Sequence, residues 1–272
     1  MDSKIYCKSI IMPISFINRN NSGNISLINR NNSGRLSMSP APSIVTTGLI
    51  LNLDAGNPAS YPGSGTIWTD LSGNNNSGSL VNGPTFSSAN GGSITFDGVD
   101  DYVFLPANFF NPNSGTPFTV SLWFKTSTAG LIFGQQNTST PNSSTGYVPA
   151  IYADSNGKIR TSCFWGGATS NQSVSTLNVT DNTWHNITVT FASNSQISYL
   201  DGNSFATLSK TQNNYSSVYY YFIGTGTWNG WPNLVFSPFF TGNIANMVFY
   251  NRALTDQEIL QNFNAQKSRF GL

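Results

Sequence analysis

Three carboxylates lie close together in the sequence, at Asp97, Asp100 and Asp101. Carboxylate and carbonyl oxygens are the ligands that calcium takes in proteins, so these residues are candidate calcium ligands. An Asp-Gly-x-Asp-Asp segment is also ordinary turn chemistry, because Gly accepts positive φ and Asp hydrogen-bonds its own backbone. The sequence therefore offers either a calcium site or a polar turn here, and it requires no cofactor.

Carboxylates spaced for glycan hydrolysis do not fall on any expected strand. Glycosidases need one carboxyl group as acid and a second as nucleophile or base. Glu258 is the only Glu, and it lies in a helix-capping pattern. Asp100 and Asp101 are adjacent, so on a strand they would point to opposite faces. His185 is the only His, and we interpret it as structural. We assign no catalytic residue and predict that the chain is not an enzyme, with a glycoside hydrolase as the distant alternative.

Tryptophans in Gly- and Asn-rich segments are candidate sugar-stacking residues. Trp165, Trp228 and Trp231 lie in such segments, where exposed rings beside polar side chains are expected. The alternative is that all six tryptophans pack in the interior. The remaining three fall in or beside strand patterns and are expected to support the sheets: Trp68, Trp123 and Trp184.

Short strands must position these residues. Residues 118–125 alternate apolar and polar side chains, which is typical of a strand with one buried face. Asn156-Gly157 indicates a tight hairpin, and residues 93–105 read as a second hairpin around the three carboxylates. Further strands are expected at 49–54, 184–191, 196–200, 219–223 and 243–250.

One helix closes the chain. Thr255 and Glu258 fit a capping box, followed by an apolar face of Ile259, Leu260 and Phe263. Many short strands with frequent turns and one terminal helix predict an all-β fold. We expect an antiparallel two-sheet jelly-roll sandwich with one short C-terminal helix and an extended N-terminal repeat arm.

Residues 1–45 differ from the remainder. The segment 15–25 recurs eleven residues later at 26–36, and a Pro linker leads into a domain at 46–272. Two such repeats cannot bury a core alone, so we expect a docking arm, with a disordered leader as the alternative. The expected docking residues are Phe16, Ile17, Arg19, Leu27, Ile28, Arg30 and Arg35.

Composition limits the partners. Only 8% of the 272 residues are charged, where about a quarter is usual. This suits a subunit partly covered by neighbours, and we expect a homo-oligomer. The net charge of +1 argues against nucleic acid, although the arm is basic and the domain slightly acidic. No secretory signal or membrane-spanning segment is recognised, so we expect synthesis in a host cytoplasm and no membrane insertion.

Six segments in order resemble a known superfamily: 48–54, 68–73, 96–103, 118–124, 184–190 and 244–255. They are similar to the laminin-G-like and pentraxin-like branch of the concanavalin A-like lectin/glucanase superfamily. The resemblance covers about residues 48–272 and implies a jelly-roll sandwich. Members bind glycans or proteins, hydrolyse glycans or serve as architecture, and several bind calcium at rim loops.

The domain also resembles those on structural proteins of tailed phages and large DNA viruses. The leading hypothesis is a non-enzymatic virion subunit of a capsid, tail or fibre. Its arm would bind other virion proteins, and its lectin-like sandwich would be displayed. The alternative is a glycan-binding module, and the two are compatible because a virion subunit can bind host surface glycans.

Overall fold

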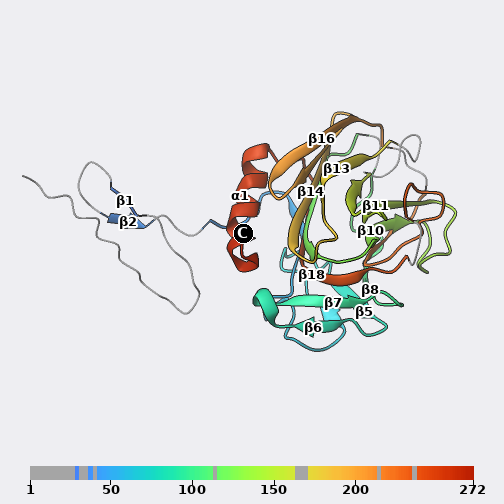
Figure 1. Cartoon of the computed structure of the whole chain (residues 1–272), viewed down its shortest axis with the longest axis horizontal. Helices are drawn as coiled ribbons and strands as arrows, with labels where there is room; N and C mark the ends of the chain where they lie inside the picture. Colours follow the sequence, from blue (N-terminus) through green and yellow to red (C-terminus); the bar gives the residue numbers. More distant parts are fainter. Residues whose placement is uncertain are drawn as a thin grey trace, which may run out of the picture. The chain divides into compact units, whose positions relative to one another are not determined.

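The computed structural model describes residues 28–30, 36–38, 42–112, 115–162, 171–212, 216–234 and 238–272. Its contacts divide the chain into two units, 1–42 and 43–272. In the first unit, β1 (Ile28–Arg30) pairs antiparallel with β2 (Leu36–Met38) (Figure 1). The side chains of all seven expected docking residues lie outside the described part of the structure.

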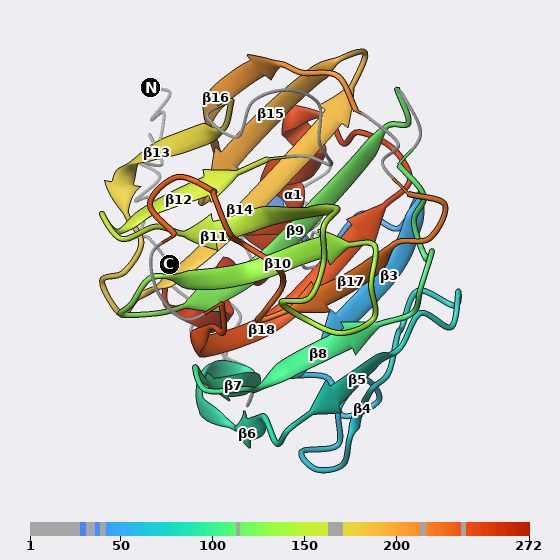
Figure 2. The ribbon, with the colours of Figure 1, turned by 90° about the vertical axis from the view of Figure 1, so that its right-hand side faces the viewer.

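The second unit is a sandwich of two antiparallel sheets (Figure 2). The front sheet, which faces the viewer in Figure 2, has this strand order: β13 (Ser173–Asn178), β12 (Lys158–Thr161), β11 (Tyr147–Ala153), β10 (Gly130–Gln136), β17 (Tyr220–Ile223), β8 (Tyr102–Leu105), β5 (Gly78–Val81) and β4 (Ile67–Trp68). The rear sheet has this order: β16 (Asn203–Ser209), β15 (Ser195–Leu200), β14 (Trp184–Ala192), β9 (Phe118–Lys125), β18 (Thr241–Tyr250), β7 (Ser93–Asp97) and β6 (Thr85–Ser87). Outside this order, β3 (Leu49–Asp54) pairs with β18. The predicted all-β sandwich with one short C-terminal helix is confirmed.

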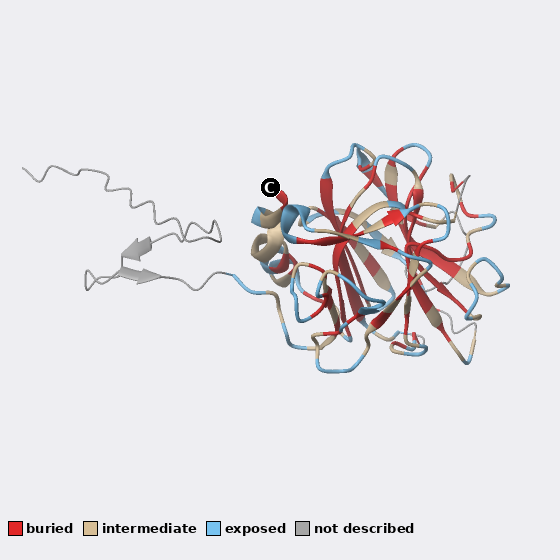
Figure 3. Ribbon diagram, turned by 90° about the horizontal axis from the view of Figure 1, so that it is seen from below, coloured by how far each residue is buried: buried red, intermediate tan, exposed pale blue. Residues whose placement is uncertain are grey.

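The core lies between the sheets and follows strand alternation. Along β9, Phe118, Val120, Leu122 and Phe124 point inward and are buried, as the sequence predicts. The buried residues concentrate in the strands, whereas exposed residues gather in the connections (Figure 3). On the outer face of β9, Trp123 is covered by the C-terminal segment, and both faces of this central strand are buried from Phe118 to Phe124.

The hairpin predicted at residues 93–105 is wrong. β7 pairs with β6 and β18 in the rear sheet, whereas β8 pairs with β5 and β17 in the front sheet. The turn between them is a corner that joins the two sheets. Gly98 has φ of 80°, and a Cβ there would collide with Thr241 Oγ1. Because of this crossover, the inward apolar residues of β7 and of β8 enter the core from opposite sheets.

The C-terminal helix α1 (Asp256–Gln266) begins with the predicted capping box. Thr255 Oγ1 accepts a hydrogen bond from Glu258 N at 3.3 Å, and Glu258 Oε2 accepts one from Thr255 N at 2.9 Å. Ile259 is buried, but Leu260 is 48% exposed, so the predicted apolar face is wrong at Leu260. Successive helical residues point about 100° apart, and the buried face continues through Asn262 instead.

A short 3₁₀ helix, η2 (Lys267–Phe270), extends α1 over the outer face of β9. Phe270 stacks on Trp123 with ring centroids 4.2 Å apart, and Phe263 stacks at 5.5 Å. Trp123 Nε1 donates to Gln266 Oε1 at 2.7 Å. We call this packing of α1 and η2 on Trp123 the C-terminal clasp. Within the described residues, no helix is long and apolar enough to cross a bilayer.

Candidate functional site

Four aromatic side chains lie on the outer face of the front sheet, away from the core. They alternate with core residues along β8 and β17, and they are Tyr102, Phe104, Tyr220 and Phe222. Their rings form a connected row: Phe104 to Tyr220 at 6.0 Å and 20° between ring planes, Phe104 to Phe222 at 5.3 Å, and Tyr102 to Phe222 at 5.8 Å. We call this row the aromatic strip.

The aromatic strip is partly exposed to solvent. Phe222 is fully buried, whereas Tyr102, Phe104 and Tyr220 are half-buried. Two further residues lie on the same outer face of the sheet. Ser79 on β5 pairs with Phe104, and Ile67 on β4 pairs with Ser79 and is 50% exposed. Neighbouring strands are about 4.8 Å apart, so this open face spans roughly 14 Å from β4 to β17.

The other half of the front sheet is covered by residues 224–234, which follow β17. A Cβ on Gly134 would lie only 2.8 Å from Thr225 O and 3.2 Å from Gly226 Cα, so the segment passes directly over β10. Gln136 Oε1 accepts from Thr227 N at 3.0 Å, and Tyr152 OH donates to Pro232 O at 2.8 Å. These bonds fix the covering segment on β10 and β11.

The predicted sugar-stacking tryptophans are separated by this arrangement. Trp231 is only 6% exposed and belongs to the core, so the expectation of an exposed ring is wrong. Its burial follows from the fixed covering segment, which turns the ring inward. Trp228 is half-buried at the segment's turn, and Trp165 lies outside the described residues. Trp68, Trp123 and Trp184 are buried, as expected for sheet-supporting residues.

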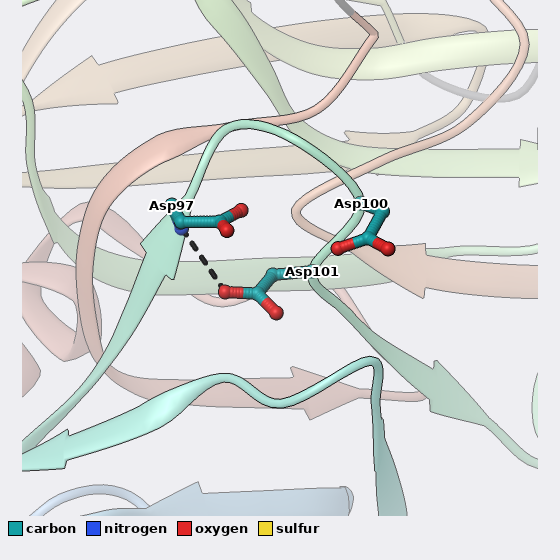
Figure 4. Close-up of side chains that lie close together, drawn as sticks. All are labelled: Asp97, Asp100 and Asp101. Carbon is teal, nitrogen blue, oxygen red and sulfur yellow. Dashed lines mark hydrogen bonds between the residues drawn. The ribbon is translucent and has the colours of Figure 1, made fainter.

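The three carboxylates meet at the corner between β7 and β8 (Figure 4). One oxygen from each of Asp97, Asp100 and Asp101 lies within 4.8 Å of the others. This spacing suits oxygens that share one calcium ion at about 2.4 Å each. Asp101 Oδ2 accepts from Asp97 N at 3.1 Å. Burial raises the pKa of Asp101. The hydrogen bond from Asp97 N lowers this pKa, but the charges of Asp97 and Asp100 raise it, and the overall shift is upward. Calcium at this corner stays a prediction.

His185 is held between two carboxylates at the start of β14. Its Nδ1 lies 2.8 Å from Asp201 Oδ2, and its Nε2 lies 3.3 Å from Asp181 Oδ1. Burial alone lowers the pKa of His185, but the hydrogen bond and charge of Asp201, together with Asp181, raise it overall. Burial raises the pKa of Asp181, but Thr183 and His185 lower it overall. These contacts support a structural role for His185.

The free energy of unfolding is expected to fall as pH rises from about 6 to about 9, and this fall should be absent in His185→Gln. Because the folded pKa of His185 is raised, its contribution is fully present below the ordinary value of 6.5. That contribution is lost as pH rises through the raised pKa. Asp181 contributes above its ordinary 3.8 and loses its contribution as pH falls. Urea unfolding of both proteins across this range measures the effect, and equal falls would contradict it.

The sequence profile of the concanavalin A-like lectin/glucanases superfamily matches residues 97–260, which is more than half of the chain. The chain belongs to this superfamily. The match begins at the acidic corner and ends in α1, so it includes the aromatic strip and the covering segment of this superfamily member. The search of curated proteins found no match.

Solved structures share the fold at low sequence identity. Trypanosoma rangeli sialidase in complex with sialic acid has a TM-score of 0.59 and 16% identity, covering 90% of this chain and 36% of the sialidase. A second similar structure is domain 4 of AbnA, a GH43 extracellular arabinanase from Geobacillus stearothermophilus, in complex with arabinotriose. Its TM-score is 0.51 at 15% identity, and the match covers 79% of this chain and 97% of that domain. The binding domain of Paraclostridial Mosquitocidal Protein 1 has a TM-score of 0.53 and 16% identity, and the match covers 81% of this chain and 52% of that chain.

These structures correct one prediction. The expectation that the chain is not an enzyme is overturned, because sialidases are prominent among the proteins that share its fold. The chain spans about a third of the sialidase, and the likeness is one of fold.

Proposed function

We propose that residues 43–272 form a carbohydrate-binding domain whose ligand lies on the aromatic strip. The observation that carries this proposal is the row of Tyr102, Phe104 and Tyr220 on the open face of the front sheet. Aromatic rings that lie outside the core and remain partly exposed are typical of a binding surface. The superfamily match and the arabinotriose-bound neighbour support a saccharide as the ligand class.

The geometry of the strip suits sugar rings. Phe104 and Tyr220 stack with their planes 20° apart, so together they form an apolar patch that the carbon–hydrogen groups of a sugar can contact. The buried Phe222 contacts Phe104 and Tyr102 and limits the movement of their rings, which reduces the entropy lost on binding. Gln136 pairs with Tyr220 and accepts from Thr227 N, so the half-buried Trp228 that follows Thr227 is the next aromatic residue that a longer glycan would meet.

Tyr220→Ala is expected to weaken glycan binding at least about tenfold, because it removes one half of the stacking surface. Phe104→Ala should have a similar effect. A glycan array identifies the ligand with the unaltered protein, and titration calorimetry then gives the dissociation constants of the variants.

Leu177→Ala is the matched control, because Leu177 is 59% exposed on β13 and lies far along the sheet from the strip. Its affinity should equal that of the unaltered protein. Tyr220→Phe keeps the ring and should retain most of the affinity. Unchanged binding in both alanine variants, with their folds intact, would rule out the strip as the site.

The virion role stays a separate proposal that depends on the N-terminal arm. Its support is the duplicated sequence, the basic charge and the β1–β2 pairing. Deletion of residues 1–42 should abolish incorporation into particles and leave a folded domain. Normal incorporation of the truncated protein would contradict this role. The proposed glycan-binding function does not depend on this outcome.

A further inference from the structure

We infer that the aromatic strip selects uncharged glycans and disfavours those that carry carboxylate or sulfate groups. This inference rests on the proposed function and names the ligand class of the same site. It differs from what the sialic acid bound to the sialidase would suggest. Two observations carry it: the carboxylates at one end of the strip, and the positions of the domain's cations.

Negative charge lies next to the strip at the start of β8, beside Tyr102. Asp97 and Asp100 are exposed, and Asp100 precedes Tyr102 by two residues. Asn82 Nδ2 donates to Asp100 O at 2.9 Å, and Val81 pairs with Tyr102, so this corner is held beside the strip. An anionic sugar on Tyr102 would lie close to these carboxylates, and like charges repel.

The cations of the domain lie elsewhere. Residues 46–272 contain seven Lys and Arg, and the structure describes all of them: Lys125, Lys158, Arg160, Lys210, Arg252, Lys267 and Arg269. Three belong to ion pairs, Arg160 with Asp154, Arg252 with Glu258 and Arg269 with Asp54, at 2.6 Å each.

The four lysines are also placed away from the strip. Lys210 is buried and donates from Nζ to Asn171 O at 2.7 Å. Lys158 Nζ donates to Thr176 O on edge strand β13 at 2.7 Å. Lys125 lies two residues after Trp123 on β9 and therefore points to the outer face of the rear sheet. Lys267 lies over Phe263 in the C-terminal clasp. Arg and Lys make the strongest hydrogen bonds to carboxylate and sulfate groups, and in the described part of the front sheet these residues lie several strands away from Tyr220.

The test uses the full chain on an array that presents each neutral oligosaccharide beside its sialylated, sulfated and uronate derivatives. EDTA keeps the carboxylates free of metal. The neutral form should bind, and each added anionic group should weaken binding at least about tenfold at low salt. This penalty should shrink at about 1 M NaCl, where charges are screened within about 3 Å.

Variants separate this inference from the proposed function. Asp100→Asn should narrow the preference for neutral glycans at least about twofold, whereas the matched Asp256→Asn on α1 should not. Anionic glycans that bind best, and that lose binding in Tyr220→Ala, would overturn the inference and leave carbohydrate binding standing. Binding of no glycan at all would overturn both.

Discussion

Replacing Trp123 with alanine is expected to lower the free energy of unfolding by about 3–5 kcal/mol, which is the usual cost of removing a buried tryptophan. Trp123 is fully buried under the C-terminal clasp, between Phe263 and Phe270. The substitution removes both stacking contacts and leaves Gln266 Oε1 without its 2.7 Å hydrogen bond. The clasp then has little apolar surface left on which to hold α1 and η2.

Urea unfolding followed by circular dichroism measures this loss. Trp123→Phe keeps an aromatic ring but no N–H, so it should cost clearly less than the alanine variant. Trp228→Ala is the matched control, because Trp228 is half-buried at a turn and should cost less. A loss below about 1 kcal/mol in Trp123→Ala would show that the clasp is not a major source of stability.

Asp154→Ala is expected to cost about 3–5 kcal/mol, the range seen when one partner of a buried ion pair is removed. The Asp154 side chain is completely buried, and its Oδ2 accepts from Arg160 Nε at 2.6 Å. Its Oδ1 accepts from the backbone N–H groups of Asn156 and Lys158 at 2.9 Å each. The variant therefore leaves one guanidinium and two backbone donors of the β11–β12 turn without their acceptor.

Asp154→Asn separates these contributions. It keeps an oxygen for the two backbone donors but loses the charge that pairs with Arg160, so an intermediate loss is expected. Asp100→Ala is the control for removing an exposed carboxylate and should change stability by less than about 0.5 kcal/mol. The same urea titrations give all three values. Equal stability of Asp154→Ala and Asp100→Ala would contradict the assigned role.

The fold follows from local patterns that the sequence states directly. The alternation at residues 118–125, the Asn156-Gly157 turn and the capping box at Thr255 each depend on neighbours within a few residues. The partners of residues 93–105 do not. Asp97-Gly98 signals a turn, but a turn within a sheet and a corner between sheets use the same residues. Only tertiary packing decides between them.

The aromatic strip was missed for a related reason. Residues 102–105 and 220–223 are apolar on both faces, which reads as strands buried on both sides. Residues 224–234 cover only part of that outer face and leave Tyr102, Phe104 and Tyr220 half-buried. Trp231 shows the converse, because a Gly- and Asn-rich context suggested exposure and the same segment buries it. Neither outcome is encoded in local composition.

Strand β18 has a consequence for how the domain is made. One edge of β18 pairs with β7 and then with β3, and its other edge pairs with β9, so it completes the rear sheet. Leu53 faces Met247 across that pairing, although they are far apart in the sequence. During synthesis, β3, β7 and β9 must therefore wait with unpaired edges until residues 241–250 leave the ribosome. Chains with such distant pairings fold slowly, and these edges are the surfaces most exposed to aggregation before the last strand arrives.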